Sequence, residues 1–561
     1  MGAADNSAGP NLRPTGLAGL SWSELLGAVG SAEVVVAPGG RATGELRCTG
    51  VTADSRLVQA GDLYVAVPGA SRHGADFTAE ALRRGARAVL TDAAGAERVR
   101  LAAESVPTGP ATGSGASAGG VPVAVVPQPR SVIPVLADQV YDHPATRLKL
   151  YGITGTNGKT TTAYLLQAVL RAAGQRVGLI GTIGYQLDDR RLESRRTTVT
   201  TPEAAELYAL LAVLVEQGAD AVVMEVSSHA LALGRVDGLR FDVAAFTNFG
   251  SDHLDFHHDL DSYFAAKASL FTRQRAARAV INLDDPRGRQ LIDQAGREGM
   301  AEVRTVSLDG PADYAAPDRR PAGKGRTALS VRTPHGVVPA TIGLPGEFNV
   351  RNAVTALAMA DLAGIELTVA AAGLRDAVVP GRMQRIALGA TAPAVFVDFA
   401  HTPQAVAAVL ASLAGHRRIV VLGCGGDRDT EKRAPMGAAA VAGAELVVVT
   451  DDNPRTEEPA TIRAEVLRGA ATEVARSGRD VTVVDEGSRR DAIRVALRTA
   501  GPDDVVAILG KGHERGQEIA GTVVPFADED AVREIYAELS DSAVARATTE
   551  SDKSVEGGVD Q

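Results

Sequence analysis

Residues 151–162 read Tyr-Gly-Ile-Thr-Gly-Thr-Asn-Gly-Lys-Thr-Thr-Thr. The apolar residues before this stretch predict a strand that ends at Tyr151, and the apolar spacing of residues 163–170 predicts a helix after it. A glycine-rich loop between a strand and a helix turns backbone N–H groups and the positive helix end toward a phosphate. The stretch therefore predicts a nucleotide phosphate site, in which Lys159 contacts the terminal phosphates and Thr160 holds Mg²⁺.

This stretch departs from the common nucleotide-binding loop at one position. That loop has a glycine five residues before its Gly-Lys pair, where this chain has Ile153, and Gly152 comes one residue too early. A glycine-rich turn from strand to helix can also exist without a ligand. The Gly-Lys-Thr-Thr-Thr sequence favours the phosphate site, and it indicates ATP or GTP without saying what happens to the nucleotide.

Length and composition limit the kind of protein. With 561 residues and 45% hydrophobic content, the chain is expected to form about three or four globular domains. The net charge of -10 argues against a nucleic-acid partner. Two cysteines, Cys48 and Cys424, permit no disulfide framework. No membrane span or signal peptide is evident, so we expect a cytoplasmic protein that does not insert into membranes.

The chain is expected to be an α/β protein of three domains with a low-complexity insertion at 107–120. The predicted boundaries are a disordered tail at 1–18, a small N-terminal α/β domain at 19–147, a central P-loop ATPase-like parallel sheet at 148–380, a C-terminal Rossmann-like domain at 381–540 and a disordered tail at 541–561. In the first domain, Asp54-Ser55-Arg56 forms a polar loop that could bind hydroxyls and phosphates, or could be a solvated turn.

The central domain offers several candidate residues near the phosphate loop. Glu225 ends an apolar strand, where a carboxylate ligand of Mg²⁺ belongs, although such an acid could instead cap the next helix. His253 follows another strand and could bind a metal or be structural. Lys267 lies on a predicted helix and, taken alone, would be an ordinary surface lysine. Asn349 and Asn352 share one helical face and could read a base edge.

Four apolar strands of the last domain each run into polar residues. They end near Asp398, Leu422, Thr450 and Leu509, and helices separate them, so the sheet should be parallel. Open α/β sheets bind ligands at the carboxyl ends of their strands. The mixture of cationic and anionic residues after these ends predicts a site for a zwitterion.

Several motifs together resemble one family. They lie at residues 154–162, 225–231, 252–257, 349–352, and 452–455 with 510–514. At these positions the chain resembles the Mur ligase family, and within it the MurE-type members that act in peptidoglycan synthesis. The resemblance spans roughly Val51 to Ile535, and the Asp-Asn-Pro-Arg tetrad is typical of members that use diaminopimelate rather than lysine.

The resemblance implies a reaction. ATP phosphorylates the D-glutamyl γ-carboxylate of UDP-N-acetylmuramoyl-L-alanyl-D-glutamate, and the amine of diaminopimelate attacks the resulting acyl phosphate. Such enzymes need Mg²⁺, are cytoplasmic, and are for the most part monomers that close on their substrates. The N-terminal, central and C-terminal domains hold the UDP end, ATP and the incoming amino acid, respectively.

The resemblance also assigns residues to sites. The UDP-muramoyl-peptide would contact Asp54, Ser55, Arg56, Thr200, Thr201, Ser228 and Arg235. ATP would contact Gly155, Thr156, Asn157, Gly158, Lys159, Thr160, Thr161, Asn349, Asn352, Arg382 and Asp398. Diaminopimelate would contact Arg428, Asp452, Asn453, Pro454, Arg455, Gly510 and Glu514. The catalytic set would be Lys159, Glu225, His253 and Lys267, and the metal ligands Thr160, Glu225, His253 and Lys267, the last as a carbamate (N6-carboxylysine).

Two positions depart from the family pattern. Gly250-Ser251 stands where the family has Ser-Arg, and Phe399 replaces a tyrosine. Two alternatives stay open: a related ligase that adds another amino acid or a dipeptide, and a catalytically silent nucleotide-binding regulator. The sequence does not distinguish meso- from LL-diaminopimelate, because both isomers carry the same carboxylates and amines.

Overall fold

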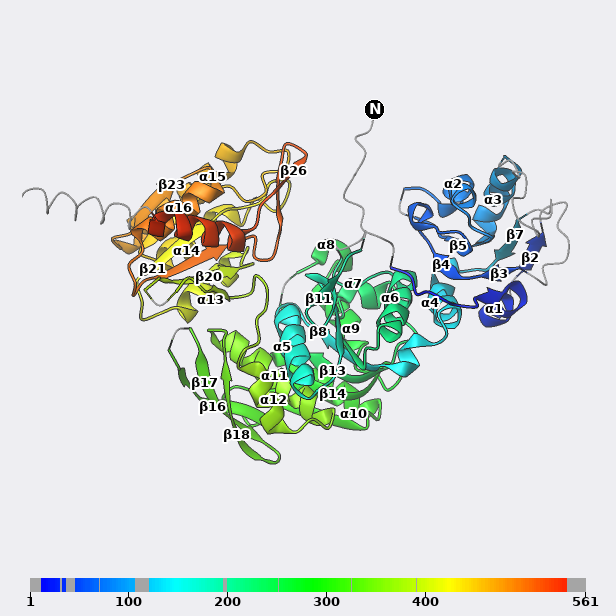
Figure 1. The fold of residues 1–561 in the computed structure, drawn as a ribbon, viewed down its shortest axis with the longest axis horizontal. Coiled ribbons are helices and arrows are strands. Elements are labelled where there is room, and N and C mark those ends of the chain that lie inside the picture. Colours follow the sequence, from blue (N-terminus) through cyan, green and yellow to red (C-terminus); the bar gives the residue numbers. More distant parts are fainter. Residues whose placement is uncertain are drawn as a thin grey trace, which may run out of the picture. The chain divides into compact units, whose positions relative to one another are not determined.

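The structure is a computed structural model that describes residues 12–30, 33–36, 46–69, 71–105, 121–194, 199–250, 252–323, 325–389 and 391–541 (Figure 1). The insertion expected at 107–120, and most of the two expected tails, lie outside the described residues. The chain divides into two compact units: Met1–Ala315 with Val354–Gly373, and Ala316–Ala353 with Leu374–Gln561. The boundary between them falls inside β16 (Tyr314–Pro321), α11 (Glu347–Leu362) and α12 (Leu367–Leu374).

The first unit begins with a small α/β part. Its sheet has the order β2-β7-β6-β5-β4, in which only β2 is antiparallel to its neighbour among the described strands. The strands are β2 (Glu33–Val36), β4 (Gly50–Thr52), β5 (Asp62–Ala66), β6 (Ala88–Thr91) and β7 (Pro122–Val125). The other elements are β1 (Leu20–Ser21), β3 (Arg47–Cys48), α1 (Trp22–Val29), α2 (Thr78–Arg83), α3 (Ala93–Ser105), α4 (Pro129–Val140) and the 3-10 turns η2 (Ser55–Leu57), η3 (Gly74–Phe77) and η4 (Pro144–Arg147).

The larger sheet of the first unit has the order β11-β10-β9-β12-β8-β13-β14-β15. Its strands are β8 (Lys149–Thr154), β9 (Val177–Gly181), β10 (Gly184–Leu187), β11 (Arg190–Leu192), β12 (Ala221–Glu225), β13 (Phe241–Phe246), β14 (Ala276–Asn282) and β15 (Glu302–Ser307). Its helices are α5 (Lys159–Ala172), α6 (Ala204–Glu216), α7 (Ser228–Ala232), α8 (Leu254–His257), α9 (Leu260–Ala268) and α10 (Pro286–Arg297). In the sheet order β9-β12-β8-β13-β14-β15, each strand is parallel to its neighbours, as the apolar runs predict.

The strand register brings three strand ends level. Glu225 of β12 pairs with Ile153 of β8, and Phe246 of β13 pairs with Thr154 of β8. The residues that follow these strands therefore meet at one edge of the sheet. The sequence Thr200-Thr201-Pro202-Glu203 predicts a helix cap with proline in the first turn of the helix. This prediction is wrong, because α6 begins at Ala204 with Glu203 as its N-cap, and Pro202 lies before the helix. The reason is that Thr201 instead bonds the backbone after β12.

The second unit contains a hairpin and a second parallel sheet. The hairpin pairs β17 (Thr327–Thr333) with β18 (Gly336–Ile342). The sheet order is β19-β20-β24-β21-β22-β23, with β19 antiparallel. Its strands are β19 (Gln384–Ile386), β20 (Ala394–Asp398), β21 (Arg418–Leu422), β22 (Leu446–Val449), β23 (Thr482–Asp485) and β24 (Val505–Leu509). The four predicted strands are confirmed, and the expected α/β class with parallel sheets is confirmed with them.

Helices alternate with these strands, and a short hairpin follows the last one. The helices are α13 (Pro403–Ser412), α14 (Arg433–Gly443), α15 (Pro459–Ser477), α16 (Arg489–Thr499) and a final helix at 528–541, and the hairpin is β25 (Gly516–Ile519) with β26 (Thr522–Pro525). Among the helices in the described part of the chain, none is both long enough and apolar enough to cross a membrane.

A fully buried ion pair supports the end of β24. Arg489 donates through Nε and Nη2 to the two carboxylate oxygens of Asp528, at 2.7 and 2.8 Å, and both side chains are 0% exposed. Arg489 Nη2 also donates to the Leu509 carbonyl at 3.0 Å. The pair thus joins α16, the final helix and the last residue of β24.

We expect Arg489→Met to lower the free energy of unfolding of the second unit by about 3–5 kcal/mol, because Asp528 would keep a buried charge without its cation. Urea unfolding followed by far-ultraviolet circular dichroism measures the change, while fluorescence of Trp22, the single tryptophan, reports on the first unit.

The neighbouring Arg490 provides a matched control. It is 36% exposed and pairs with Glu534 and Glu538 at 2.6 and 2.8 Å, so Arg490→Met should cost at most about 1 kcal/mol. The double variant Arg489→Met/Asp528→Leu should recover most of the loss. Equal losses for Arg489→Met and Arg490→Met would contradict the role of burial.

Candidate active site

The loop between β8 and α5 has a conformation that requires glycine at two positions. Gly155 and Gly158 have φ values of 150° and 86°. A Cβ atom at Gly155 would lie 1.9 Å from the Thr247 hydroxyl oxygen, which follows β13. The backbone N–H of Thr156 donates to the Asn248 carbonyl at 2.9 Å. The end of β13 therefore fixes the shape of the loop that precedes α5.

Lys159 and Lys267 converge on this loop. Lys159 Nζ donates to the carbonyls of Gly155 and Thr156, both at 2.9 Å. Lys267 Nζ donates to the same Gly155 carbonyl at 2.9 Å and lies 4.4 Å from the centre of the Tyr263 ring. The two side chains thus share one acceptor.

Lys267 is not the surface residue that its sequence context alone suggests. Its side chain on α9 is buried. Burial, followed by the charge of Lys159, holds the pKa of Lys267 well below its ordinary value, and the charge of Asp252 opposes the shift only in part. A lowered pKa favours the neutral amine, which is the nucleophilic form.

Glu225 and Thr160 are in direct contact. Glu225 is 0% exposed, and its Oε2 accepts a hydrogen bond from the Thr160 hydroxyl at 2.9 Å. Thr182 donates to both carboxylate oxygens, through its backbone N–H at 2.8 Å and its hydroxyl at 3.1 Å. The alternative that Glu225 caps the next helix is wrong, because Ser227 is the N-cap of α7.

The His253 region is linked to the loop through Tyr263. The Tyr263 hydroxyl lies 3.1 Å from the Thr156 hydroxyl, and the ring centres of Tyr263 and His253 are 6.1 Å apart. His253 has a left-handed backbone with φ 54°, and its ring is 4.8 Å from that of His229. Across the described residues, no three His, Cys, Asp or Glu side chains are arranged to hold a metal ion by themselves.

The first sequence departure lies next to this loop. The backbone N–H of Gly250 donates to the Thr156 hydroxyl at 3.0 Å. Ser251 lies outside the described residues. The small residue at position 250 therefore contributes its backbone to the loop.

A cavity of about 430 Å³ in the first unit brings together two groups of predicted residues. Asp54, Ser55 and Arg56 line it from the N-terminal part, where Asp54 caps η2, and Arg235 lines it from the region after α7. Four further arginine or aromatic side chains that the sequence analysis did not select also line it: Tyr64, Arg72, Phe77 and Arg130. The cavity therefore holds four guanidinium groups, which suit phosphate oxygens, beside aromatic rings. It also holds the carboxylates of Asp54, Glu80, Glu203 and Glu206.

Hydrogen bonds connect this cavity to Glu225. Arg235 pairs with Glu203 at 2.7 Å and donates to the Thr201 carbonyl at 3.0 Å. The Thr201 hydroxyl donates to the Glu225 carbonyl at 2.8 Å. Thr200 and Ser228 flank this path, since the Thr200 hydroxyl lies 3.1 Å from that of Thr182, and the Ser228 hydroxyl lies 3.0 Å from His257 Nε2.

The remaining predicted nucleotide residues lie in the second unit. Asn349 and Asn352 are buried, and Asn349 donates to the Pro345 carbonyl at 2.8 Å. The Arg382 guanidinium lies 4.5 Å from the centre of the Phe399 ring, so the residue that replaces tyrosine supports this arginine. Burial raises the pKa of Asp398, and the charge of Arg382 opposes that shift.

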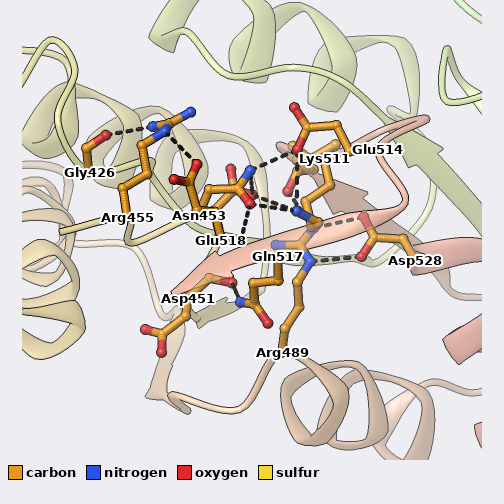
Figure 2. A network of polar contacts seen from close by, with 12 residues as sticks. Gly426, Asp451, Asn453, Arg455, Arg489, Lys511, Glu514, Gln517, Glu518 and Asp528 are labelled. Carbon is orange, nitrogen blue, oxygen red and sulfur yellow. Dashed lines mark hydrogen bonds and ion pairs between the residues drawn. The ribbon is translucent and has the colours of Figure 1, made fainter. Parts of the chain in front are cut away.

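A polar network in the second unit joins the predicted amino-acid residues (Figure 2). Asn453 Nδ2 donates to Glu514 Oε2 at 2.8 Å. Arg455 has a left-handed backbone with φ 55°, its N–H donates to the Glu518 carbonyl at 2.9 Å, and its guanidinium donates to the Gly426 carbonyl. Gly510, with φ 111°, brings the turn after β24 within reach of Asp452.

Most of the predicted set meets here. Arg428 is exposed on the loop after β21, and Pro454 contributes backbone close to Gly426. The sequence analysis missed Lys511 and Glu518, which Figure 2 shows at the centre of the network. Lys511 lies inside the Gly-Lys-Gly-His-Glu turn and could have been found from that position.

Family models match most of the chain. The Mur ligase family catalytic domain matches residues 47–135, the Mur ligase middle domain matches 153–360, and the Mur ligase glutamate ligase domain matches 381–512.

Curated relatives match almost end to end. Proteins named UDP-N-acetylmuramoyl-L-alanyl-D-glutamate--2,6-diaminopimelate ligase from Streptomyces avermitilis and Corynebacterium glutamicum are each 43% identical, over 93% of this chain and 97% of theirs. A UDP-N-acetylmuramyl-tripeptide synthetase from Leifsonia xyli is 39% identical, over 86% of this chain and 91% of its own.

Solved structures agree in fold. A UDP-N-acetylmuramoyl-L-alanyl-D-glutamate--2,6-diaminopimelate ligase superposes with a TM-score of 0.63 at 31% identity, covering 89% of this chain and 96% of its own. A MurF from Acinetobacter baumannii, at 17% identity and a TM-score of 0.57 over 88% and 96% of the two chains, shares the fold. On these grounds the chain belongs to the Mur ligase family.

Proposed function

We propose that this chain is an ATP-dependent ligase that joins diaminopimelate to the D-glutamyl γ-carboxylate of UDP-N-acetylmuramoyl-L-alanyl-D-glutamate, in cytoplasmic synthesis of peptidoglycan precursors. The observation that carries the substrate assignment is the network around Asn453. It places the guanidinium of Arg455 and the carboxylate of Glu514 on either side of one amide, which suits the carboxylate and ammonium of an amino-acid end. The near full-length relatives that carry this name support the same assignment.

The first step would be phosphoryl transfer at the loop after β8. The ammonium of Lys159 is bonded to carbonyls of the loop and would turn to the terminal phosphates when ATP binds there. The hydroxyl of Thr160 and the carboxylate of Glu225 are 2.9 Å apart and supply the oxygen ligands that Mg²⁺ prefers, so these residues fit the metal. Bound Mg²⁺ would supply positive charge to the phosphate oxygens.

Lys267 is proposed to carry a carbamate. Its neutral amine would attack the carbon of CO₂, forming an N–C bond while one C–O π bond becomes a carboxylate, and the released proton would pass to water. In the structure, the amines of Lys159 and Lys267 both donate to the Gly155 carbonyl. The carbamate would replace the amine of Lys267 with an anion beside Lys159. It would therefore place a negative charge beside the Lys159 ammonium and add a carboxylate that, with His253, could hold a second metal ion.

The cavity lined by Arg56, Arg72, Arg130 and Arg235 is proposed to hold the UDP-muramoyl-dipeptide. The guanidiniums suit the diphosphate, and the Phe77 ring offers a flat apolar surface for the base. The path through Arg235 and Thr201 to Glu225 would lead the peptide end toward the phosphate loop.

The direct test measures phosphate release from ATP in the presence of UDP-N-acetylmuramoyl-L-alanyl-D-glutamate, with meso-diaminopimelate, LL-diaminopimelate, L-lysine or no amine. We expect release that depends on diaminopimelate, because only diaminopimelate gives Arg455 a distal carboxylate, and the comparison of the two isomers shows which one the enzyme uses. Release with L-lysine would favour a related ligase with another substrate. Nucleotide binding without release for any amine would favour the silent regulator.

We expect Lys267→Ala to lower kcat on the order of 10²–10³-fold, because a preorganised charge would be lost. Added acetate should restore part of the rate, and degassed wild-type enzyme should slow until bicarbonate returns. The matched control is Lys149→Ala, whose side chain is 67% exposed and pairs with Asp242 at 3.4 Å, and it should keep full activity. A fully active Lys267→Ala enzyme would rule out the carbamate.

We expect Arg455→Lys to raise the KM for diaminopimelate about ten- to a hundred-fold, because an ammonium cannot reproduce the planar fork of the guanidinium. The KM for ATP should change far less. Arg515→Lys serves as the control, since Arg515 is 68% exposed and its contact with Asp530 is long, at 3.8 Å. Equal increases in both KM values would place Arg455 outside the amino-acid site.

A further inference from the structure

Lys511 is a fully buried cation at the edge of the proposed amino-acid site. Its side chain is 0% exposed and follows the left-handed turn at Gly510. Its Nζ lies 3.2 Å from Asn453 Oδ1, 3.3 Å from Glu514 Oε2 and 3.6 Å from Asp452 Oδ1. A buried ammonium is costly unless it is paired, and here two carboxylates and an amide oxygen surround it.

These contacts fix the orientation of the Asn453 amide. Its oxygen accepts from Lys511 Nζ at 3.2 Å and from the Glu518 N–H at 3.0 Å, so both donors hold the oxygen end on one side. Its nitrogen therefore faces Glu514 at 2.8 Å and reaches Asp452 only at 3.5 Å. The second N–H of the amide thus has no short bond to Asp452 and could donate to a ligand carboxylate.

The same contacts orient Glu514. Both Lys511 and Asn453 bond its Oε2, and within the second unit no described residue bonds its Oε1. Lys511 offsets one of the two neighbouring carboxylates, Asp452 and Glu514, which leaves one net negative charge. Glu514 Oε1, which Lys511 and Asn453 do not bond, is the oxygen that could accept from a ligand ammonium.

The network continues from Lys511 to Arg455. Glu518 donates its N–H to Asn453, accepts from the Arg455 N–H through its carbonyl, and lies 3.5 Å from the Arg455 guanidinium through its carboxylate. Figure 2 shows this chain of contacts from Lys511 to Arg455. Lys511 therefore contacts Glu514, the group that would bind an ammonium, directly, and is linked to Arg455, the group that would bind a carboxylate, through Asn453 and Glu518.

We propose that Lys511 is a positioning residue that fixes the Asn453 amide and the Glu514 carboxylate so that the site selects an amino acid with both an ammonium and a carboxylate at its far end. This proposal rests on the proposed ligase function. Without Lys511, the Asn453 amide could turn its oxygen toward the ligand carboxylate, and Glu514 would meet Asp452 with no cation between them. Selectivity against L-lysine, which lacks the distal carboxylate, would then fall.

The experiment is steady-state kinetics of Lys511→Met, with Arg515→Met as the control that removes an exposed cation four residues away. We expect the KM for diaminopimelate to rise about ten- to a hundred-fold, with the KM values for ATP and the UDP-muramoyl-dipeptide within about two-fold. L-Lysine should compete with diaminopimelate relatively better than in the wild type. Arg515→Met should leave all of these values unchanged.

A double-mutant cycle with Asn453→Ala separates positioning from a merely structural role. If Lys511 acts through Asn453, the double variant should be at most about three-fold worse in KM than Asn453→Ala alone, because the two effects are not independent. Multiplicative effects, or equal rises in all three KM values, would overturn the proposal.

The test still gives an answer if Lys511→Met does not fold, and it separates failure of this proposal from failure of the proposed function. If Lys511→Met does not fold, the same cycle with Lys511→Arg applies, and a rise in the diaminopimelate KM alone is again expected. Failure of the wild-type enzyme to release phosphate with diaminopimelate would instead overturn the proposed function, and that assay needs no variant.

Discussion

The register of three parallel strands decides where the chemistry of the first unit lies. β8, β12 and β13 end level with one another, so the phosphate loop, Glu225 and Thr247 meet at one edge of the sheet. Because side chains alternate between the faces of a sheet, a shift of one residue in β12 would turn Glu225 away from Thr160. The contact of 2.9 Å between these two residues, and the path through Thr201 to the arginine-lined cavity, both depend on this register.

The second unit shows the same constraint at a second set of parallel strand ends. β20, β21, β22 and β24 are parallel, and the residues after β22 and β24 meet in the network around Asn453. Here the strand ends supply an amide, a carboxylate and a guanidinium instead of a glycine-rich loop. The buried ion pair of Arg489 and Asp528 supports the end of β24, because Arg489 also donates to the Leu509 carbonyl. Rigid support of this kind keeps polar groups in place without help from a ligand.

Local patterns in the sequence predict much of this arrangement. Glycines, apolar runs and the Gly-Lys-Thr sequence predict the strand, loop and helix around Lys159, and strand ends predict that Asn453 and Glu514 meet. The burial of Lys267 and Lys511 could not be predicted in this way, because it depends on which distant elements cover each side chain. Arg72 and Arg130 were missed for the same reason: each is an unremarkable arginine until the fold places it on one cavity with Arg235. The start of α6 was placed too early because Thr201 is used by the strand next to it rather than by its own helix.

The two buried lysines, Lys267 and Lys511, have different surroundings, which favour different chemistry. Lys267 meets a carbonyl, an aromatic ring and the charge of Lys159, so its pKa is lowered and its neutral form is favoured. Lys511 meets two carboxylates and an amide oxygen, and these contacts hold its side chain in place. A neutral amine can form a new bond, whereas a fixed ammonium can only orient its neighbours. The roles proposed for the two lysines, a carbamate at Lys267 and positioning at Lys511, therefore differ because of the charges that each fold environment places around them.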